Sequence, residues 1–384
     1  MASPLDLVLA ERFAPWEADG LRRRLPGSDT GASLVDFSSN DYLGLAAEPW
    51  LAETAARAAA RFGAGSGASR LLAYPGSPHR ELEECLAAWK KTESALCFSS
   101  GYATAVGTLS ALLTQEDTVI LDKLCHASLI DGARLSGAQI RVFPHNHLDR
   151  LESLLAQIRS RNPRGLLLIV TEGVFSMDGD RAPLRDIVSL KNRFGAVLMV
   201  DEAHSAGVFG KEGRGWAAEL GVSEEVDIQM GTLSKAFGCA GGYICGSRLL
   251  VDWLLNRARS FVYSTAPPPA VAAAALAALE WMRSKAGHER RAALHARMEL
   301  LNRLLKRETP PRSPIFPVAV SGNSRALEWS AHLRASGYRI PAIRYPTVPR
   351  GGERLRLTVT ARHTGDQIHA VHSLLDHLLR QDGA

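Results

Sequence analysis

Residues 196–204 read AVLMVDEAH, and this stretch decides the fold class. Five consecutive apolar residues predict a short strand that is buried on both faces, as the strands of parallel sheets are. Asp201 closes the run, and His204 follows three residues later. Ligands of open α/β sheets bind beyond the carboxyl ends of the strands. We therefore expect this strand to bring Asp201 and His204 to a ligand site.

The same pattern continues on both sides of this stretch. Short apolar runs alternate with amphipathic stretches such as 147–160 and 184–194, which we expect to be helices. This alternation predicts an α/β fold with a mostly parallel sheet. The expected strands are residues 95–98, 118–121, 139–143, 166–171, 196–200, 226–231 and 242–245.

The chain of 384 residues is long enough for two domains, since single hydrophobic cores stop growing near roughly 250–300 residues. We expect an N-terminal segment over residues 1–50 and a large domain over 51–308 that ends in a long helix at 269–306. A proline-rich segment at 310–317 predicts the boundary to a small α+β domain at 309–384. The elements expected there are strands near 315–320, 338–343 and 355–359, a helix near 325–336 and a last helix from residue 365.

Composition excludes several classes of protein. With 46% hydrophobic and 22% charged residues, the chain has the balance of a globular protein. Its apolar runs are far shorter than the ~18 residues of a membrane helix, and charges interrupt the N-terminus, so we expect a cytoplasmic protein. The net charge of +5 suits an anionic ligand, but the basic residues are too interleaved with acids to indicate nucleic-acid binding. Five dispersed cysteines without a CxxC pair argue against disulfides and structural zinc.

Lys235 is the candidate for covalent chemistry. It follows the apolar run at 226–231 and is flanked by Thr232 and Ser234. Desolvation disfavours the charged ammonium and so releases the neutral amine that forms a Schiff base. Asp201 lies 34 residues upstream at a neighbouring strand end and could keep a pyridinium nitrogen protonated. Together these residues predict that Lys235 carries pyridoxal 5'-phosphate (PLP).

A third part of the pattern is the turn at residues 99–103, SSGYA, between a strand and the helix expected at 104–113. Backbone N–H groups at a helix start attract anions, and small residues let a phosphate approach. Thr232, Ser234 and Thr265 could add hydroxyl donors. Each signal has a simpler explanation, because strand-terminal acids and Ser-Gly turns often cap helices. Their order and spacing together favour a PLP site.

These motifs resemble, in order, those of the α-oxoamine synthases, and the resemblance runs from about residue 15 to 380. It implies the type I fold of PLP enzymes, as in aspartate aminotransferase, and a homodimer with active sites at the subunit interface. It also implies the condensation of an amino acid with an acyl thioester and loss of CO2. The matching segments are Ser99-Ser-Gly101-Tyr102, His126-Ala-Ser, Glu172-Gly-Val-Phe-Ser176-Met-Asp-Gly-Asp180, Asp201-Glu-Ala-His204 and Thr232-Leu-Ser234-Lys235-Ala-Phe-Gly.

Within this family the chain is most similar to the branch that joins L-alanine to a pimeloyl thioester, of CoA or of a carrier protein, in biotin biosynthesis. Tyr345 is also similar to 5-aminolevulinate synthases, so another α-oxoamine synthase, of that type or a 2-amino-3-ketobutyrate CoA ligase, is the alternative. The segments that favour the pimeloyl branch are Leu21-Arg22-Arg23-Arg24, Asn40-Asp-Tyr-Leu-Gly, His145-Asn146, Ala342-Ile343-Arg344 and Arg354-Leu-Arg356.

The resemblance implies roles for the residues around the cofactor. Lys235 would bind PLP and move the α-proton, and Asp201 would pair with the ring nitrogen. His204 and Ser176 would hydrogen-bond the phenolic oxygen. His126 would stack on the ring and steer the substrate, although it could also be only a helix cap.

Further residues are implied for the phosphate and the substrates. Gly101 and Tyr102 would bind phosphate, helped by Thr232, Ser234 and the partner subunit's Thr265. Arg344 would clamp the alanine carboxylate, since a guanidinium offers a bidentate fork, and Asn40 would assist. Thr347 would lie along the acyl chain. Two assignments stay open: Arg22 would bind the distal carboxylate or belong to a solvated basic cluster, and Glu172 would orient the site or be structural.

Other functional classes fit the sequence less well. Asp-Glu-Ala-His at 201–204 also occurs in helicases, but the phosphate loop that they require is absent. The glycines at 63–68 follow an expected helix rather than a strand, which argues against a dinucleotide site. His145 and His147 have no carboxylate or cysteine set nearby in the sequence that would complete a metal site. A non-enzymatic relative would be expected to lack Lys235 or Asp201, and this chain has both.

Overall fold

The computed structural model describes residues 3–23, 25, 34–72, 78–162, 164–306 and 313–382. The chain divides into a large unit, Asn40–Ser176 with Asp180–His295, and a small unit, Met1–Ser39 with Met177–Gly179 and Ala296–Ala384. The short excursion Met177–Gly179 interrupts the large unit. The domain limits expected at 50/51 and 308/309 stay a prediction.

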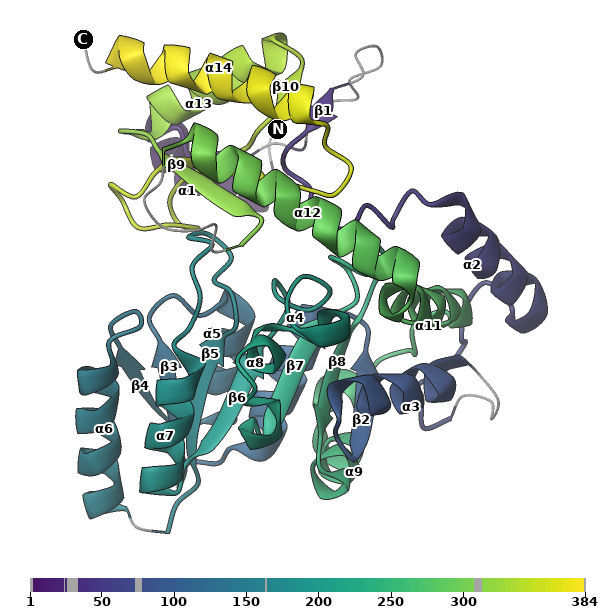
Figure 1. Cartoon of the computed structure of the whole chain (residues 1–384). Helices are drawn as coiled ribbons and strands as arrows, with labels where there is room; N and C mark the ends of the chain where they lie inside the picture. The colour runs from purple at the N-terminus through teal and green to yellow at the C-terminus, as the bar shows by residue number, and fades with distance from the viewer. Residues whose placement is uncertain are drawn as a thin grey trace. The chain divides into compact units, whose positions relative to one another are not determined.

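A seven-stranded sheet forms the centre of the large unit, in the order β2-β8-β7-β6-β5-β3-β4 (Figure 1). Only β8 runs antiparallel to its neighbours, so the predicted α/β fold with a mostly parallel sheet is confirmed. Each strand overlaps one that the apolar runs predict. The strands are β2 (Ser94–Phe98), β3 (Thr118–Asp122), β4 (Gln139–Phe143), β5 (Leu167–Glu172), β6 (Val197–Asp201), β7 (Ile228–Thr232) and β8 (Gly242–Gly246).

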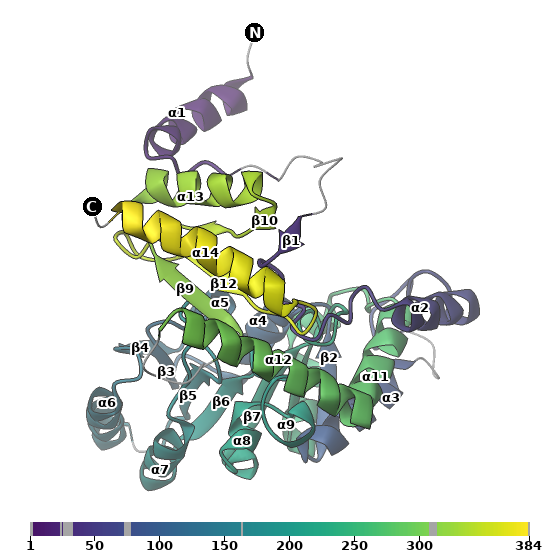
Figure 2. The ribbon, with the colours of Figure 1, turned by 45° about the horizontal axis from the view of Figure 1, so that its top comes forward.

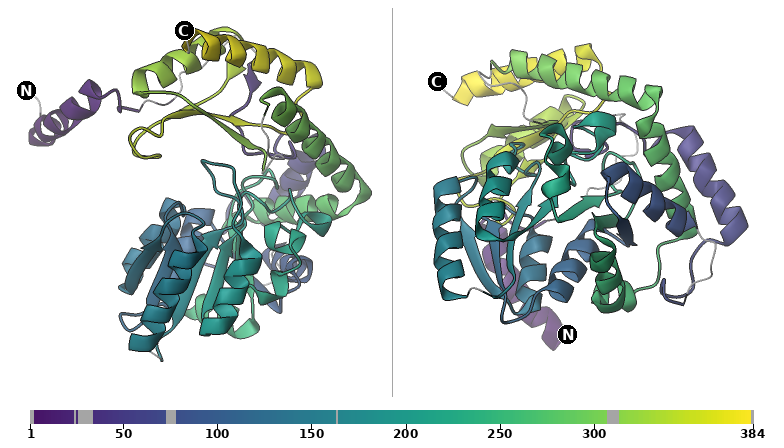
Figure 3. Two further views of the ribbon diagram at one scale, coloured as in Figure 1. Left: turned by 60° about the vertical axis from the view of Figure 1, so that its left-hand side comes forward. Right: turned by 60° about the horizontal axis from the view of Figure 1, so that its bottom comes forward.

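Helices cover both faces of this sheet, because successive strand residues point to opposite sides. On β5, Leu168 and Val170 belong to one buried cluster, and Leu167 and Ile169 belong to another. The first cluster includes residues of α4 (Gly101–Leu112), α5 (Ala127–Ser136), α9 (Arg248–Arg257) and α10 (Arg259–Val262); the second includes residues of α6 (Leu148–Arg161), α7 (Leu184–Phe194) and α8 (Trp216–Glu219). Figure 3 shows α6 and α7 side by side on the same face of the sheet.

Three further helices and two 3₁₀ turns lie wholly within the large unit: α2 (Pro49–Phe62), α3 (Pro78–Lys90), α11 (Pro269–Arg283), Lys211–Gly213 and Ser223–Glu225. The single long helix expected at 269–306 is wrong. It is broken at Ser284, whose ψ of 171° is extended, so that α11 ends and α12 (Lys285–Leu304) begins. Ser284 Oγ accepts from the Gly287 N–H at 3.3 Å and so caps the start of α12.

The small unit contains a three-stranded antiparallel sheet in the order β11-β12-β9. Its strands are β9 (Ile315–Ala319), β11 (Ala342–Ile343) and β12 (Arg354–Thr358), and α13 (Asn323–Ala335) and α14 (Gly365–Asp382) lie side by side (Figure 2). The strand expected at 338–343 is divided, because Pro341 cannot donate a ladder hydrogen bond. Its first part, β10 (Tyr338–Arg339), pairs with β1 (Val35–Asp36), and α1 (Pro4–Ala18) precedes β1.

None of the helices described is both long and apolar enough to cross a bilayer.

Candidate active site

The candidate site of the large unit is built where neighbouring parallel strands end. Glu172 ends β5 and Asp201 ends β6, and the two are paired in the sheet register. Thr232 ends the adjacent strand β7. All three residues are buried. Two acids and a hydroxyl are therefore brought to one edge of the sheet, as the position of Asp201 after its apolar run predicts.

Lys235 lies at this edge and contacts His204. Its Nζ is 2.8 Å from His204 Nε2, and His204 Nδ1 is 2.5 Å from the hydroxyl oxygen of Tyr42. The Lys235 amine can donate to Nε2, in which case the histidine proton sits on Nδ1. The Tyr42 hydroxyl then accepts from Nδ1 and donates to Asn40 Oδ1 at 3.4 Å. One polar chain thus joins Lys235 to Asn40.

The carboxyl of Asp201 is buried, and a cationic partner would favour its charged form. Burial raises the pKa of its carboxyl, and the positive charge of Lys235 and a hydrogen bond from the Ala203 N–H only partly oppose this. A ring N–H⁺ donating to this carboxylate would favour its charged form. Asp201 therefore fits the pyridinium nitrogen of PLP.

His126 and Glu172 form a second contact beside Asp201. The His126 N–H donates to Glu172 Oε1 at 2.5 Å, and His126 Nδ1 accepts from Ser128 at the start of α5. Burial lowers the pKa of His126, so the ring is neutral and its proton sits on Nε2. Burial and then Asp201 raise the pKa of Glu172 well above its usual range. His126 is thus a helix cap, while its stacking on the cofactor stays a prediction.

The start of α4 has the chemistry of a phosphate cradle. A Cβ built on Gly101 would lie 3.5 Å from Thr232 Oγ1, so this hydroxyl is next to the first turn of the helix. Thr232 Oγ1 lies 2.7 Å from Ser234 Oγ. Tyr102 is exposed, and its hydroxyl donates to Asp131 at 2.8 Å. Hydroxyls beside the positive end of a twelve-residue helix suit a phosphate group.

Thr265 is exposed in this chain, and its backbone oxygen accepts from Ser264 Oγ at 3.3 Å. Its expected contribution to the partner subunit's site stays a prediction.

Arg22, Arg344 and Thr347 lie in the small unit, whereas Asn40 and Ser176 belong to the large unit. Arg344 donates to the Gly20 carbonyl, and Arg23 donates to Thr347 Oγ1 at 2.8 Å. Burial and then the charge of Arg23 lower the pKa of Arg344, so the two guanidinium groups lie near each other. Arg22 forms an ion pair with Glu17. Arg344, Thr347 and Arg23 are therefore brought together, which suits an anionic ligand.

Three residues that support the candidate site residues or their neighbours were not expected from the sequence. Tyr42 and Arg23 stand in the motifs Asn40-Asp-Tyr and Arg22-Arg23-Arg24, and this position was their only signal. Glu202 is fully buried, and its carboxylate accepts the N–H groups of Trp216 and Ala217 at 2.8 and 2.9 Å. Glu202 therefore holds the start of α8 while its neighbour Asp201 belongs to the candidate site.

Comparisons with known proteins cover almost the whole chain. Residues 32–374 match the family described as aminotransferase class I and II. The 8-amino-7-oxononanoate synthase of Anaeromyxobacter dehalogenans (strain 2CP-1) is 48% identical over 95% of this chain and 93% of its own length. That of Trichlorobacter lovleyi is 44% identical over 99% of both chains.

Two solved structures are also similar to this chain over most of its length. A serine palmitoyltransferase from S. paucimobilis with bound PLP has a TM-score of 0.90 at 28% identity and covers all of both chains. An 8-amino-7-oxononanoate synthase from Francisella tularensis has a TM-score of 0.78 at 28% identity, covering 92% of this chain and 99% of that one.

Proposed function

The chain belongs to the aminotransferase class I and II family, and from this premise we propose that it condenses L-alanine with a pimeloyl thioester. The reaction gives 8-amino-7-oxononanoate, CO2 and the free thiol, a step of biotin biosynthesis. Relatives named for this product are 44% to 48% identical over nearly the full chain. The observation that carries the proposal is the contact of Lys235 with His204 beside the buried Asp201.

The enzyme has the type I fold of PLP-dependent enzymes and uses PLP as its cofactor. When bound, PLP supplies an electron sink for breaking bonds at the Cα of the amino acid. Lys235 would hold it covalently, and Asp201 would accept a hydrogen bond from its ring nitrogen. The phosphate would lie at the start of α4, near Gly101, Tyr102, Thr232 and Ser234, with the partner subunit's Thr265.

The side chains of this enzyme then manage protons and orientation. Lys235 Nζ would take the α-proton of alanine and later return a proton to the same carbon. His204, held by Tyr42, would keep Lys235 in place in the cofactor-free enzyme; once Lys235 holds the cofactor, the tautomer protonated on Nε2 would donate with Ser176 to the phenolic oxygen. His126 would stack on the ring, with its backbone held by Glu172. Glu172 is thus proposed to be a positioning residue.

The substrate carboxylates are assigned to the small-unit arginines. Arg344 would bind the alanine carboxylate with help from Asn40, because a guanidinium pairs with both oxygens. Arg22 would bind the distal carboxylate of the pimeloyl chain, and Thr347 would lie along that chain. We further propose a cytoplasmic homodimer, with CoA or a carrier protein as the thiol.

The test follows thiol release and product mass with purified enzyme and added PLP. L-alanine, glycine and L-serine are each offered with pimeloyl-, succinyl- and acetyl-CoA, and K235A serves as the inactive control. We expect turnover with L-alanine and pimeloyl-CoA. Turnover only with glycine and succinyl-CoA would assign the chain to 5-aminolevulinate synthesis instead. Turnover only with glycine and acetyl-CoA would assign it to 2-amino-3-ketobutyrate synthesis.

A further inference from the structure

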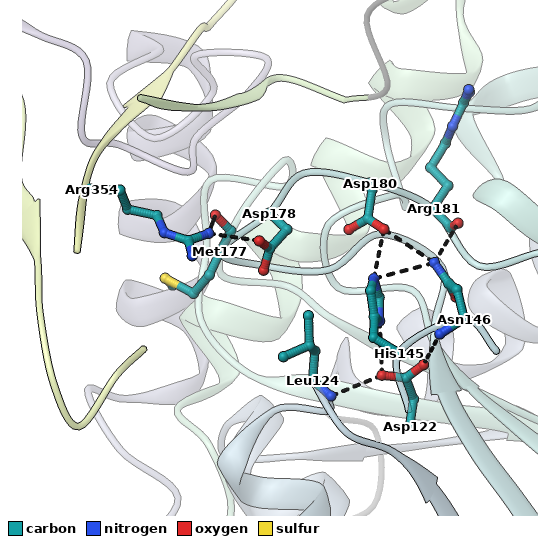
Figure 4. Close-up of polar contacts among 9 residues, drawn as sticks. All are labelled: Asp122, Leu124, His145, Asn146, Met177, Asp178, Asp180, Arg181 and Arg354. Carbon is teal, nitrogen blue, oxygen red and sulfur yellow. Dashed lines mark hydrogen bonds and ion pairs between the residues drawn. The ribbon is translucent and has the colours of Figure 1, made fainter. Parts of the chain in front are cut away.

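His145 lies between two buried carboxylates that the reaction does not use (Figure 4). Its Nδ1 is 2.9 Å from Asp122 Oδ1, and its Nε2 is 2.7 Å from Asp180 Oδ2. Asp122 is 1% and Asp180 is 8% exposed. Carboxylates only accept, so both ring nitrogens must donate and the ring is an imidazolium. Burial alone would lower the pKa of His145, but these two hydrogen bonds raise it to about 10.

Asn146 strengthens the same cluster. Its backbone has a φ of 54°, and its N–H donates to Asp122 Oδ2 at 2.8 Å. Its side-chain amide donates to Asp180 Oδ2 at 3.1 Å and to the Arg181 carbonyl at 3.3 Å. Both residues of the His145-Asn146 pair therefore hold Asp180 and anchor it to Asp122 at the end of β3.

Asp180 closes a loop that carries a proposed cofactor residue. Val174 and Arg181 form an isolated bridge, and the Phe175 N–H donates to the Asp180 carbonyl at 3.0 Å. Ser176 follows directly, so both ends of the loop beside it are held. The Phe175 ring packs edge-on against the His145 ring, with the ring centroids 4.4 Å apart.

The same loop has a second ionic anchor. Asp178 accepts from Arg354 Nη1 at 2.6 Å, and this nitrogen also donates to the Met177 carbonyl at 3.2 Å (Figure 4). Ser176 therefore lies between the His145–Asp180 contact and the Arg354–Asp178 pair along the chain. The Arg354–Asp178 pair belongs to the small unit and fixes the course of residues 177–179 within that unit.

The chemistry of the cluster favours a role in positioning. Buried ion pairs seldom add more stability than apolar residues of similar size, because desolvation cancels most of the attraction. Their directional hydrogen bonds, in contrast, define a geometry. We propose that His145 is a positioning residue of the PLP site, which holds the loop at 174–181 so that Ser176 meets the phenolic oxygen of the cofactor. This inference rests on the PLP-binding part of the proposed function.

The test is a double-mutant cycle on the PLP-loaded enzyme, with PLP affinity and the pH midpoint of the long-wavelength cofactor band as readouts. H145Q and S176A are compared with H145Q/S176A. The matched control is H147Q, two residues away on an exposed histidine. We expect H145Q and S176A each to weaken PLP binding by about 3- to 10-fold and to shift the midpoint in the same direction. The double variant should behave like S176A alone, and H147Q like the wild type.

Two results overturn the inference: effects of H145Q and S176A that multiply in the double variant, or an S176A variant without effect on the band. If H145Q does not fold, D180N replaces it, since it keeps His145 paired with Asp122 and the same non-additivity is expected. A wild-type protein that takes up no PLP contradicts the proposed function as well. A wild type with a normal band and an additive cycle contradicts only the role of His145.

Discussion

Replacing Tyr42 with phenylalanine removes one hydroxyl from the polar chain that joins Lys235 and His204 to Asn40. The ring volume is unchanged, so no cavity forms. Tyr42 is 0% and His204 is 4% exposed, and their contact is 2.5 Å long. A buried polar group that loses its partner costs about 1–3 kcal/mol. We therefore expect the free energy of unfolding of Y42F to fall by about 1–3 kcal/mol.

The assay is urea unfolding of the PLP-free protein at pH 7, followed by tryptophan fluorescence. The matched control is Y263F, because Tyr263 is 74% exposed and its hydroxyl is solvated. Y263F should change the free energy of unfolding by less than about 0.5 kcal/mol. If Y42F loses no more than Y263F, the hydroxyl does not hold His204 and the reasoning is refuted.

Three further predictions follow from other contacts. The free energy of unfolding of G132A, measured in urea, should fall by about 1–3 kcal/mol. The added Cβ would lie 2.9 Å from the Ala105 carbonyl oxygen and 3.1 Å from Val106 Cα on α4. Equal or higher stability of G132A would contradict this tight crossing of α4 and α5. The pKa of His145 is raised to about 10, so its stabilisation is full below its ordinary pKa near 6.5 and is lost as the pH rises towards 10. Wild type should therefore lose more stability than H145Q between pH 7 and 10, and parallel curves would refute this. Lys235→Ala should retain no PLP after borohydride reduction and denaturing dialysis, measured by absorbance; retained cofactor would place the attachment elsewhere.

Much of the fold could be predicted because its signal is local. The strand at 139–143 and the helix at 184–194 have the bounds that the sequence predicts, since apolar runs and helical periodicity reflect burial residue by residue. The end of an apolar run likewise identifies Asp201 as a candidate for a ligand site. The broken helix at Ser284 was less predictable, because packing decides whether a helix continues past such a residue. The strand divided at Pro341 has a local cause, the missing N–H of proline, which the expected strand at 338–343 did not take into account.

The sequence by itself determined the α/β class, the strand order along the chain and the residue types needed for PLP chemistry, with Lys235 at their centre. The class and the strands follow from patterns within about ten residues, and the residues for PLP chemistry follow from the order and spacing of their motifs along the chain. Only the tertiary structure decided which side chains meet: Tyr42 with His204, 162 residues apart, and His145 with both Asp122 and Asp180. Such contacts depend on how strands pair and helices pack, and distant residues carry no local signal of that. The protonation of His145 has the same origin, because its pKa is set by partners that folding alone brings to it.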